Sequence, residues 1–139
     1  MGAVSKEDTV TSKVVHFQFG AHDADRLANF YREVFGWRIR DARLTSVEHG
    51  VSGPYRIISA DEAEISGGVT GEGAKGVILT VQVDDIAETL ERAERLGGRR
   101  VPDVDAEQLE LEDAGGADSR FALGSFIDPE GNTIQLLKR

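Results

Sequence analysis

Polar side chains recur on one face of two apolar strands, which the alternation of the sequence predicts at residues 13–19 and 77–83. His16 and Gln18 share the polar face of the first strand, and Thr80 and Gln82 share that of the second. Gln135 lies on the polar face of a strand predicted at 133–137. A neutral imidazole can remove a proton beside a carbonyl, while amides and hydroxyls can orient an oxygenated ligand. We therefore predict that these five residues bind a small ligand, with His16 as the candidate general base if the protein is an enzyme.

Several other residues of chemical interest have more than one interpretation. Tyr55 and Phe126 could form the floor of a ligand pocket, and they could equally pack in the core. Both are kept as candidate ligand-binding residues. Asp85 fits a helix N-cap, and Ser125 lacks the G-x-S-x-G turn of an acyl-transfer nucleophile. No residue is therefore assigned a catalytic role.

The elements that position these side chains repeat, because the two halves of the sequence share one pattern of strands and a helix. Asp23 and Asp85 are the predicted N-caps of two amphipathic helices, which end at Gly36 and Gly97. A strand precedes each helix and about three strands follow it. Neither half has enough helix to cover both faces of its sheet. The sequence therefore predicts an α+β fold in which helices cover one sheet face and the polar residues of the other face surround a cavity.

The remaining strands are predicted from short alternating runs bounded by turn residues. A segment at 103–118 carries seven acidic residues and no basic one, which predicts a solvated loop or exposed hairpin. Leu109 and Leu111 alternate with glutamates there, so a short edge strand is the alternative. As a loop, the segment would act as a charged lid that favours neutral or cationic ligands. The remaining predicted strands are one that begins at Trp37–Ile39 and others at Arg43–Val47, Tyr55–Ser59, Glu64–Val69, Arg99–Val101 and Phe121–Ile127.

Length, charge and composition limit the class of protein. The 139 residues suit one domain, and the absence of cysteine excludes a disulfide scaffold and a thiol nucleophile. A net charge of −9 disfavours nucleic acid and anionic membranes as partners. Residues 1–12 are small and polar, which predicts a flexible lead-in without a secretory signal. We expect a cytoplasmic protein.

The sequence resembles the vicinal-oxygen-chelate superfamily, through the segments VVHFQFGAHDADRLANFYREVFGWRI, VILTVQVDDIAETLERAERLGGRRV and FIDPEGNTIQLL. This superfamily contains glyoxalase I, extradiol dioxygenases and bleomycin-resistance proteins, and the chain is most similar to its small bacterial glyoxalase-related members. The resemblance implies two βαβββ modules that form one cupped mixed sheet with helices on the outer face. Module one would cover 13–69, the linker 70–76 and module two 77–138, within a single domain at 13–138.

The resemblance also implies where a divalent metal would bind, since active members hold it on the first and fourth strands of each module. Those positions fall at His16, Ile78, Gln135 and, in the fourth strand of module one, near Ser66 or Gly67. In the metal-dependent alternative, the nearby Glu64 or a neighbouring chain would supply the missing ligands. A catalytic metal usually needs about three protein ligands, and one imidazole with one neutral amide falls short of that. We therefore predict neither a metal nor another cofactor.

The resulting hypothesis is a small-molecule-binding protein of this superfamily. The alternatives are a metal-dependent or His16-based isomerase, lyase or dioxygenase-like enzyme acting on a small oxygenated substrate, and an interaction protein with a collapsed cup. Because a cup has open strand edges and members of the resembled family usually assemble further, we also predict a homodimer.

Overall fold

The computed structural model describes residues 11–71, 76–101, 107–113 and 118–139. The first half forms β1 (Lys13–Gly20), α1 (Ala24–Phe35), β2 (Ile39–Ser46), β3 (Ser52–Ile58), α2 (Ala60–Ala63) and β4 (Ser66–Thr70). The second half forms β5 (Gly76–Gln82), α3 (Ile86–Arg95), β6 (Arg99–Arg100), β7 (Glu107–Asp113), β8 (Asp118–Ile127) and β9 (Thr133–Lys138).

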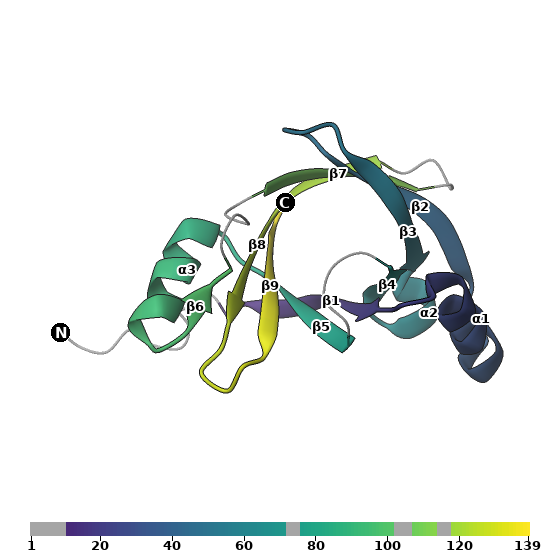
Figure 1. The fold of residues 1–139 in the computed structure, drawn as a ribbon, viewed down its shortest axis with the longest axis horizontal. Helices are drawn as coiled ribbons and strands as arrows, with labels where there is room; N and C mark the ends of the chain where they lie inside the picture. Colours follow the sequence, from purple (N-terminus) through teal and green to yellow (C-terminus); the bar gives the residue numbers. More distant parts are fainter. Residues whose placement is uncertain (1–10, 72–75, 102–106, 114–117) are drawn as a thin grey trace.

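The strands form one curved mixed sheet in the order β6-β8-β7-β2-β3-β4-β1-β5-β9. Helices α1 and α3 lie outside the curve, near opposite ends of the molecule (Figure 1). The predicted α+β fold, with a cupped sheet and helices on its outer face, is confirmed. The sheet also closes, because β8 pairs with β9 while β2 pairs with β7 and β1 with β5. The open edges expected of a cup are thus paired within the chain, which makes the cup a barrel.

Each of the two long helices begins and covers the sheet as its sequence predicts. The carboxylate of Asp23 accepts a hydrogen bond from the backbone N–H of Arg26 at 3.0 Å, and Asp85 accepts one from Glu88 at the same distance. Gly36 ends α1 with φ 71°, a left-handed conformation that favours glycine. Between α1 and the sheet lies a core of Ala28, Ile39, Ile58 and Val69. Between α3 and the sheet lies one of Val83, Ile86, Leu90, Ala122 and Leu136.

The acidic segment differs most from its predicted form. Residues 107–113 are strand β7, which pairs with β2 on one side and β8 on the other. Over this range the segment is a strand of an antiparallel pair with β8, as the strand alternative expected, but it is not an edge strand because β2 pairs with its other side. Leu111 lines the barrel cavity while Glu112 is exposed. The chain also forms one strand at 39–46 where two short ones were predicted, and the single turn of α2 was not predicted.

Parts of three predictions lie outside the described residues. These are the lead-in over 1–10, the linker over 72–75, and the acidic segment over 103–106 and 114–117. The division into two modules at 13–69 and 77–138 stays a prediction. Within the described ranges, no helix is both long enough and apolar enough to cross a membrane.

The cap of α3 offers a matched pair of substitutions. Asp85→Ala removes the acceptor of the Glu88 N–H and should lower the free energy of unfolding by about 1 kcal/mol. The adjacent and exposed Asp84 is not the cap, so Asp84→Ala should have little effect. Urea unfolding of both variants measures the difference, and equal losses would contradict the assigned cap.

Candidate functional site

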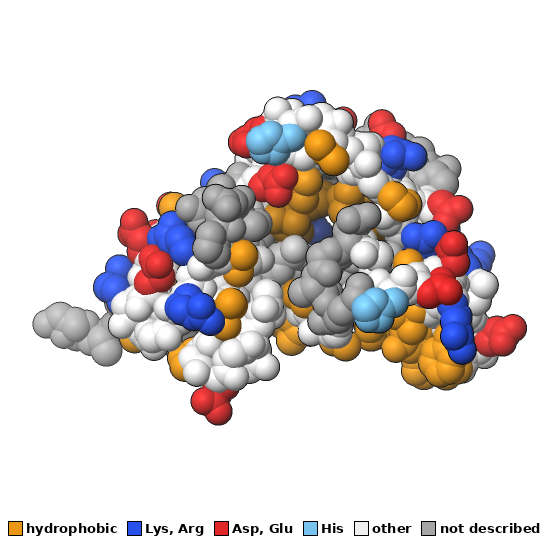
Figure 2. All heavy atoms as spheres, in the orientation of Figure 1, with side chains coloured by type: hydrophobic (Ala, Val, Ile, Leu, Met, Phe, Trp, Pro, Cys, Tyr) orange, Lys and Arg blue, Asp and Glu red, His pale blue; other side chains and the backbone are white. Residues whose placement is uncertain are grey.

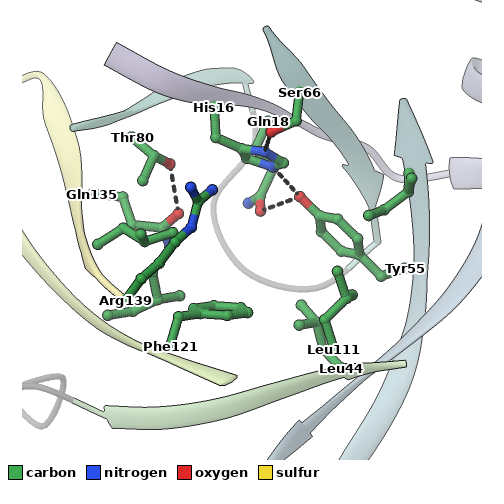
Figure 3. A pocket seen from close by; sticks show the side chains of 13 residues that line it. His16, Gln18, Leu44, Tyr55, Ser66, Thr80, Leu111, Phe121, Gln135 and Arg139 are labelled. Carbon is green, nitrogen blue, oxygen red and sulfur yellow. Dashed lines mark hydrogen bonds between the residues drawn. The ribbon is translucent and has the colours of Figure 1, made fainter. Parts of the chain in front are cut away.

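A cavity of about 240 Å³ lies inside the barrel. Polar residues gather on one wall and hydrophobic side chains form the opposite one (Figure 3). In the space-filling view, hydrophobic side chains are visible within the hollow at the centre of the molecule (Figure 2). The lining residues are His16, Gln18, Leu44, Tyr55, Ile57, Ser66, Thr80, Leu111, Phe121, Leu123, Gln135, Leu137 and Arg139.

A hydrogen-bonded network on the polar wall centres on His16. Its Nδ1 lies 2.7 Å from Ser66 Oγ on β4, and its Nε2 lies 2.8 Å from the Tyr55 hydroxyl on β3. The Tyr55 hydroxyl also lies 3.2 Å from Gln18 Oε1. The register places Ser66 directly beside His16 in the parallel pairing of β1 with β4. Three strands are thus joined through one imidazole.

The tautomer of His16 sets the direction of the bonds in this network. A neutral ring has one N–H, so it donates to one of Ser66 Oγ and the Tyr55 hydroxyl and accepts from the other. The Ser66 hydroxyl also has the carbonyl of Val15 within reach as an acceptor at 3.1 Å, and the Tyr55 hydroxyl has Gln18 Oε1 at 3.2 Å. Both ring nitrogens therefore have a partner within the protein in either tautomer.

The cavity wall keeps both ring systems uncharged. Burial, and secondarily the positive charge of Arg139, lower the pKa of His16 from its usual 6.5 to about 4. Burial raises the pKa of Tyr55 far above its usual value of 10. At neutral pH, His16 is therefore a neutral imidazole and Tyr55 a neutral phenol.

A second polar pair lies beside this network on the same wall, because Thr80 on β5 is the register neighbour of His16. Thr80 donates to Gln135 Oε1 at 2.9 Å, and the two residues are register neighbours on β5 and β9. Arg139 projects its guanidinium into the cavity between this pair and His16 (Figure 3). None of the buried side-chain nitrogen and oxygen atoms in the described ranges lacks a partner. His16, Gln18, Thr80 and Gln135 thus each have a side-chain partner within the protein.

Two glycines of β4 make room for aromatic rings on both faces of the sheet. A Cβ at Gly67 would lie 2.3 Å from the ring of Phe17 on the helix side. A Cβ at Gly68 would lie 1.9 Å from the hydroxyl oxygen of Tyr55 on the cavity side. Because real atoms do not approach this closely, the position of Tyr55 against His16 depends on Gly68.

The structure places five of the seven predicted site residues in the cavity lining: His16, Gln18, Tyr55, Thr80 and Gln135. The other two are elsewhere. Phe126 packs in the core beneath α3, and Gln82 lies beside Leu137 in the register without lining the cavity.

Sequence reasoning missed the apolar wall, Leu44, Leu111 and Phe121, and the cation Arg139. The alternation of residues along β9 could have predicted that Arg139 lines the cavity. Gln135, Leu137 and Arg139 share one parity, and all three line the cavity.

The residues at the metal positions implied by the family do not suit a divalent cation. Both ring nitrogens of His16 are engaged within the protein, and Ser66 and Gln135 offer only a hydroxyl and an amide. Ile78 is buried opposite Gln18 and does not line the cavity. No cluster of three or more His, Cys, Asp or Glu residues forms within the described part of the chain. This donor set does not fit a catalytic metal, which needs about three good ligands.

Comparison with known families agrees with this architecture. The profile of a family described as "Glyoxalase-like domain" matches residues 15–137. The chain belongs to this family. Among curated proteins, no significant match to the chain is found.

Several solved structures share the fold of this glyoxalase-like domain. A member from Vibrio splendidus 12B01 is 14% identical with a TM-score of 0.51, covering 92% of this chain and 98% of its own. A hypothetical protein from Bacillus halodurans C-125 is 12% identical with a TM-score of 0.56, covering 94% and 96%. Streptomyces coelicolor methylmalonyl-CoA epimerase is 16% identical with a TM-score of 0.55, covering 91% and 96%. At these identities the likeness shows the fold alone.

The lowered pKa of His16 predicts a pH-dependent loss of stability. The unfolded chain binds a proton at His16 below about pH 6.5, whereas the folded protein resists protonation down to about pH 4. Stability therefore falls as the pH drops through this window, by up to about 3 kcal/mol from this residue. Urea unfolding across the window should show a shallower decline in His16→Gln than in the wild type. His49→Gln, at an exposed site, should keep the wild-type slope, and parallel slopes in all three proteins would contradict a buried neutral His16.

Gly68→Ala should displace Tyr55 and lower the free energy of unfolding by about 1–3 kcal/mol, the usual range for overpacking. Gly53→Ala on β3 is the matched control, because nothing lies within 4 Å of a Cβ there. Thermal or urea unfolding of the two variants tests the difference. If Gly68→Ala is as stable as Gly53→Ala, the close approach of Tyr55 to β4 is wrong.

Proposed function

We propose that this glyoxalase-like domain binds a small organic molecule in the barrel cavity and that it works without a catalytic metal. The observation that carries the proposal is the cavity itself, with a pre-formed polar wall facing an apolar one. Ligand sites typically combine apolar walls with a few well-placed polar groups. A cavity of about 150 Å³ can hold benzene, so the 240 Å³ here would accept a substituted single ring.

The state of His16 supports binding over catalysis by a histidine base. Both ring nitrogens are held by Ser66 and Tyr55, so a substrate would have to displace one of them. A pKa of about 4 also makes the imidazole a weak base at neutral pH, where a general base works best with a pKa near 7. The enzyme hypothesis therefore requires a rearranged His16, whereas ligand binding does not.

The cavity also argues against a purely structural role. A collapsed cup would bring apolar side chains into contact across the interior, yet the barrel retains an open volume between Phe121 and Tyr55. Interiors are normally packed with few voids larger than a water molecule. A void of this size bordered by satisfied polar groups is suited to a ligand.

Assembly and location remain predictions within this proposal. Because the strand edges are paired inside the chain, a homodimer would use another surface, and the exposed Phe30, Val34 and Phe35 of α1 are the candidate. A cytoplasmic location in a bacterium, and the absence of nucleic-acid and membrane partners, rest on composition and on the family resemblance.

The proposal predicts that small aromatic fragments bind inside the barrel. In a panel of neutral and anionic single-ring compounds followed by NMR of the histidine rings, some members should shift the His16 resonances. The exposed His22 and His49 serve as internal controls and should not shift. Zinc added alone at protein-equivalent concentration should leave His16 unchanged, because its donors are engaged.

A substitution on the apolar wall tests whether the fragments bind in the cavity. Leu111→Phe reduces the cavity volume and should weaken fragment binding, whereas Leu79→Phe on the outer face, where Leu79 is 42% exposed, should not. No shift of His16 with any fragment would contradict the binding function. Stoichiometric zinc retained after dialysis and lost in His16→Ala would favour the metalloenzyme alternative.

A further inference from the structure

The charge of the cavity is unbalanced. Arg139 is the one charged residue among the described lining residues, and no aspartate or glutamate joins it there. Although Arg139 is exposed overall, its guanidinium points inward and lies close enough to His16 to act on its pKa. No hydrogen bond or ion pair joins this guanidinium to another described residue. A cation directed into a cavity with apolar walls favours an anionic occupant.

The hydrogen-bonding capacity left over beside Arg139 consists of donors. Gln135 Oε1 is already occupied by the Thr80 hydroxyl, so its amide NH₂ remains to contact a ligand. The guanidinium adds N–H groups in a planar fork and accepts nothing. Farther along the polar wall, the Tyr55 hydroxyl and both ring nitrogens of His16 already have partners within the protein. A group that only accepts hydrogen bonds therefore fits between Gln135 and Arg139.

The single charge of Arg139 and the shape of the cavity limit which accepting group the ligand can carry. One guanidinium balances a single negative charge, and its fork matches the two oxygens of a carboxylate. A phosphate dianion would bring a second charge that no described lining residue neutralises. The apolar wall of Leu44, Leu111 and Phe121 faces this end across the cavity and suits a compact ring or branched chain.

We infer that the ligand is a small monocarboxylic acid with a compact apolar body, and that Arg139 determines this specificity by pairing with the carboxylate. The inference rests on the proposed binding function, whose ligand class it names. It reverses the ligand charge expected from the acidic segment, because β7 presents Leu111 to the cavity while its Glu112 is exposed.

The test uses three probes with the same ring: benzoate, neutral benzamide and phenyl phosphate. Affinities are measured by calorimetry for the wild type, Arg139→Gln and Lys138→Gln, with the His16 ring resonances reporting occupancy of the cavity. Lys138→Gln removes the same charge from the neighbouring exposed residue of β9. Wild type and Lys138→Gln should prefer benzoate over both other probes. Arg139→Gln should lose about 10- to 100-fold in benzoate affinity and little in benzamide affinity.

The outcomes separate this inference from the function on which it rests. If benzamide or phenyl phosphate binds as well as benzoate, or if Arg139→Gln binds benzoate normally, the carboxylate assignment is overturned and the binding function stands. If none of the three probes shifts His16, both are overturned. Circular dichroism of the variants shows that a lost affinity does not reflect a lost fold.

Discussion

The imidazole of His16 holds three strands of the barrel in place through two short hydrogen bonds, to Ser66 on β4 and Tyr55 on β3. Because both nitrogens have a hydrogen-bond partner, the ring is fixed in one orientation. Burial keeps it neutral by lowering its pKa to about 4. Gly68 permits the arrangement, since any larger residue there would occupy the position of the Tyr55 hydroxyl. The hydrogen bonds around His16 are therefore formed within the protein, without a ligand.

The two ends of the cavity differ in how far the protein itself satisfies their hydrogen-bonding groups. At the His16 end, donors and acceptors are matched within the protein, so little capacity is left for a metal or for proton transfer. At the other end, Thr80 takes up the acceptor of Gln135, and the remaining amide donors stand beside the guanidinium of Arg139. Ligand binding is most favourable where hydrogen-bond donors of the protein have no partner within it. The geometry therefore directs recognition to Arg139 and leaves His16 a structural part of the wall.

The sequence predicted the local structure well and the closure of the sheet poorly. The caps Asp23 and Asp85 and the polar parity of β1 and β5 follow from short-range rules, and the structure has them. The pairing of β2 with β7 joins distant segments through sheet curvature, which no local pattern encodes. A strand at β7 was only the alternative prediction, because its acidic residues outnumber Leu109 and Leu111 and equally suit a solvated loop. Phe126 follows the opposite parity to Phe121 on β8, and it packs under α3 for that reason.

The central claim is that His16 is a neutral, internally bonded residue, and nitrogen NMR of its ring tests this most directly. At a pH of about 5.5, between the folded and unfolded pKa values, an ordinary histidine would be mostly protonated. The account predicts that His16 instead stays neutral, with one protonated and one bare ring nitrogen. An imidazolium at this pH would contradict it.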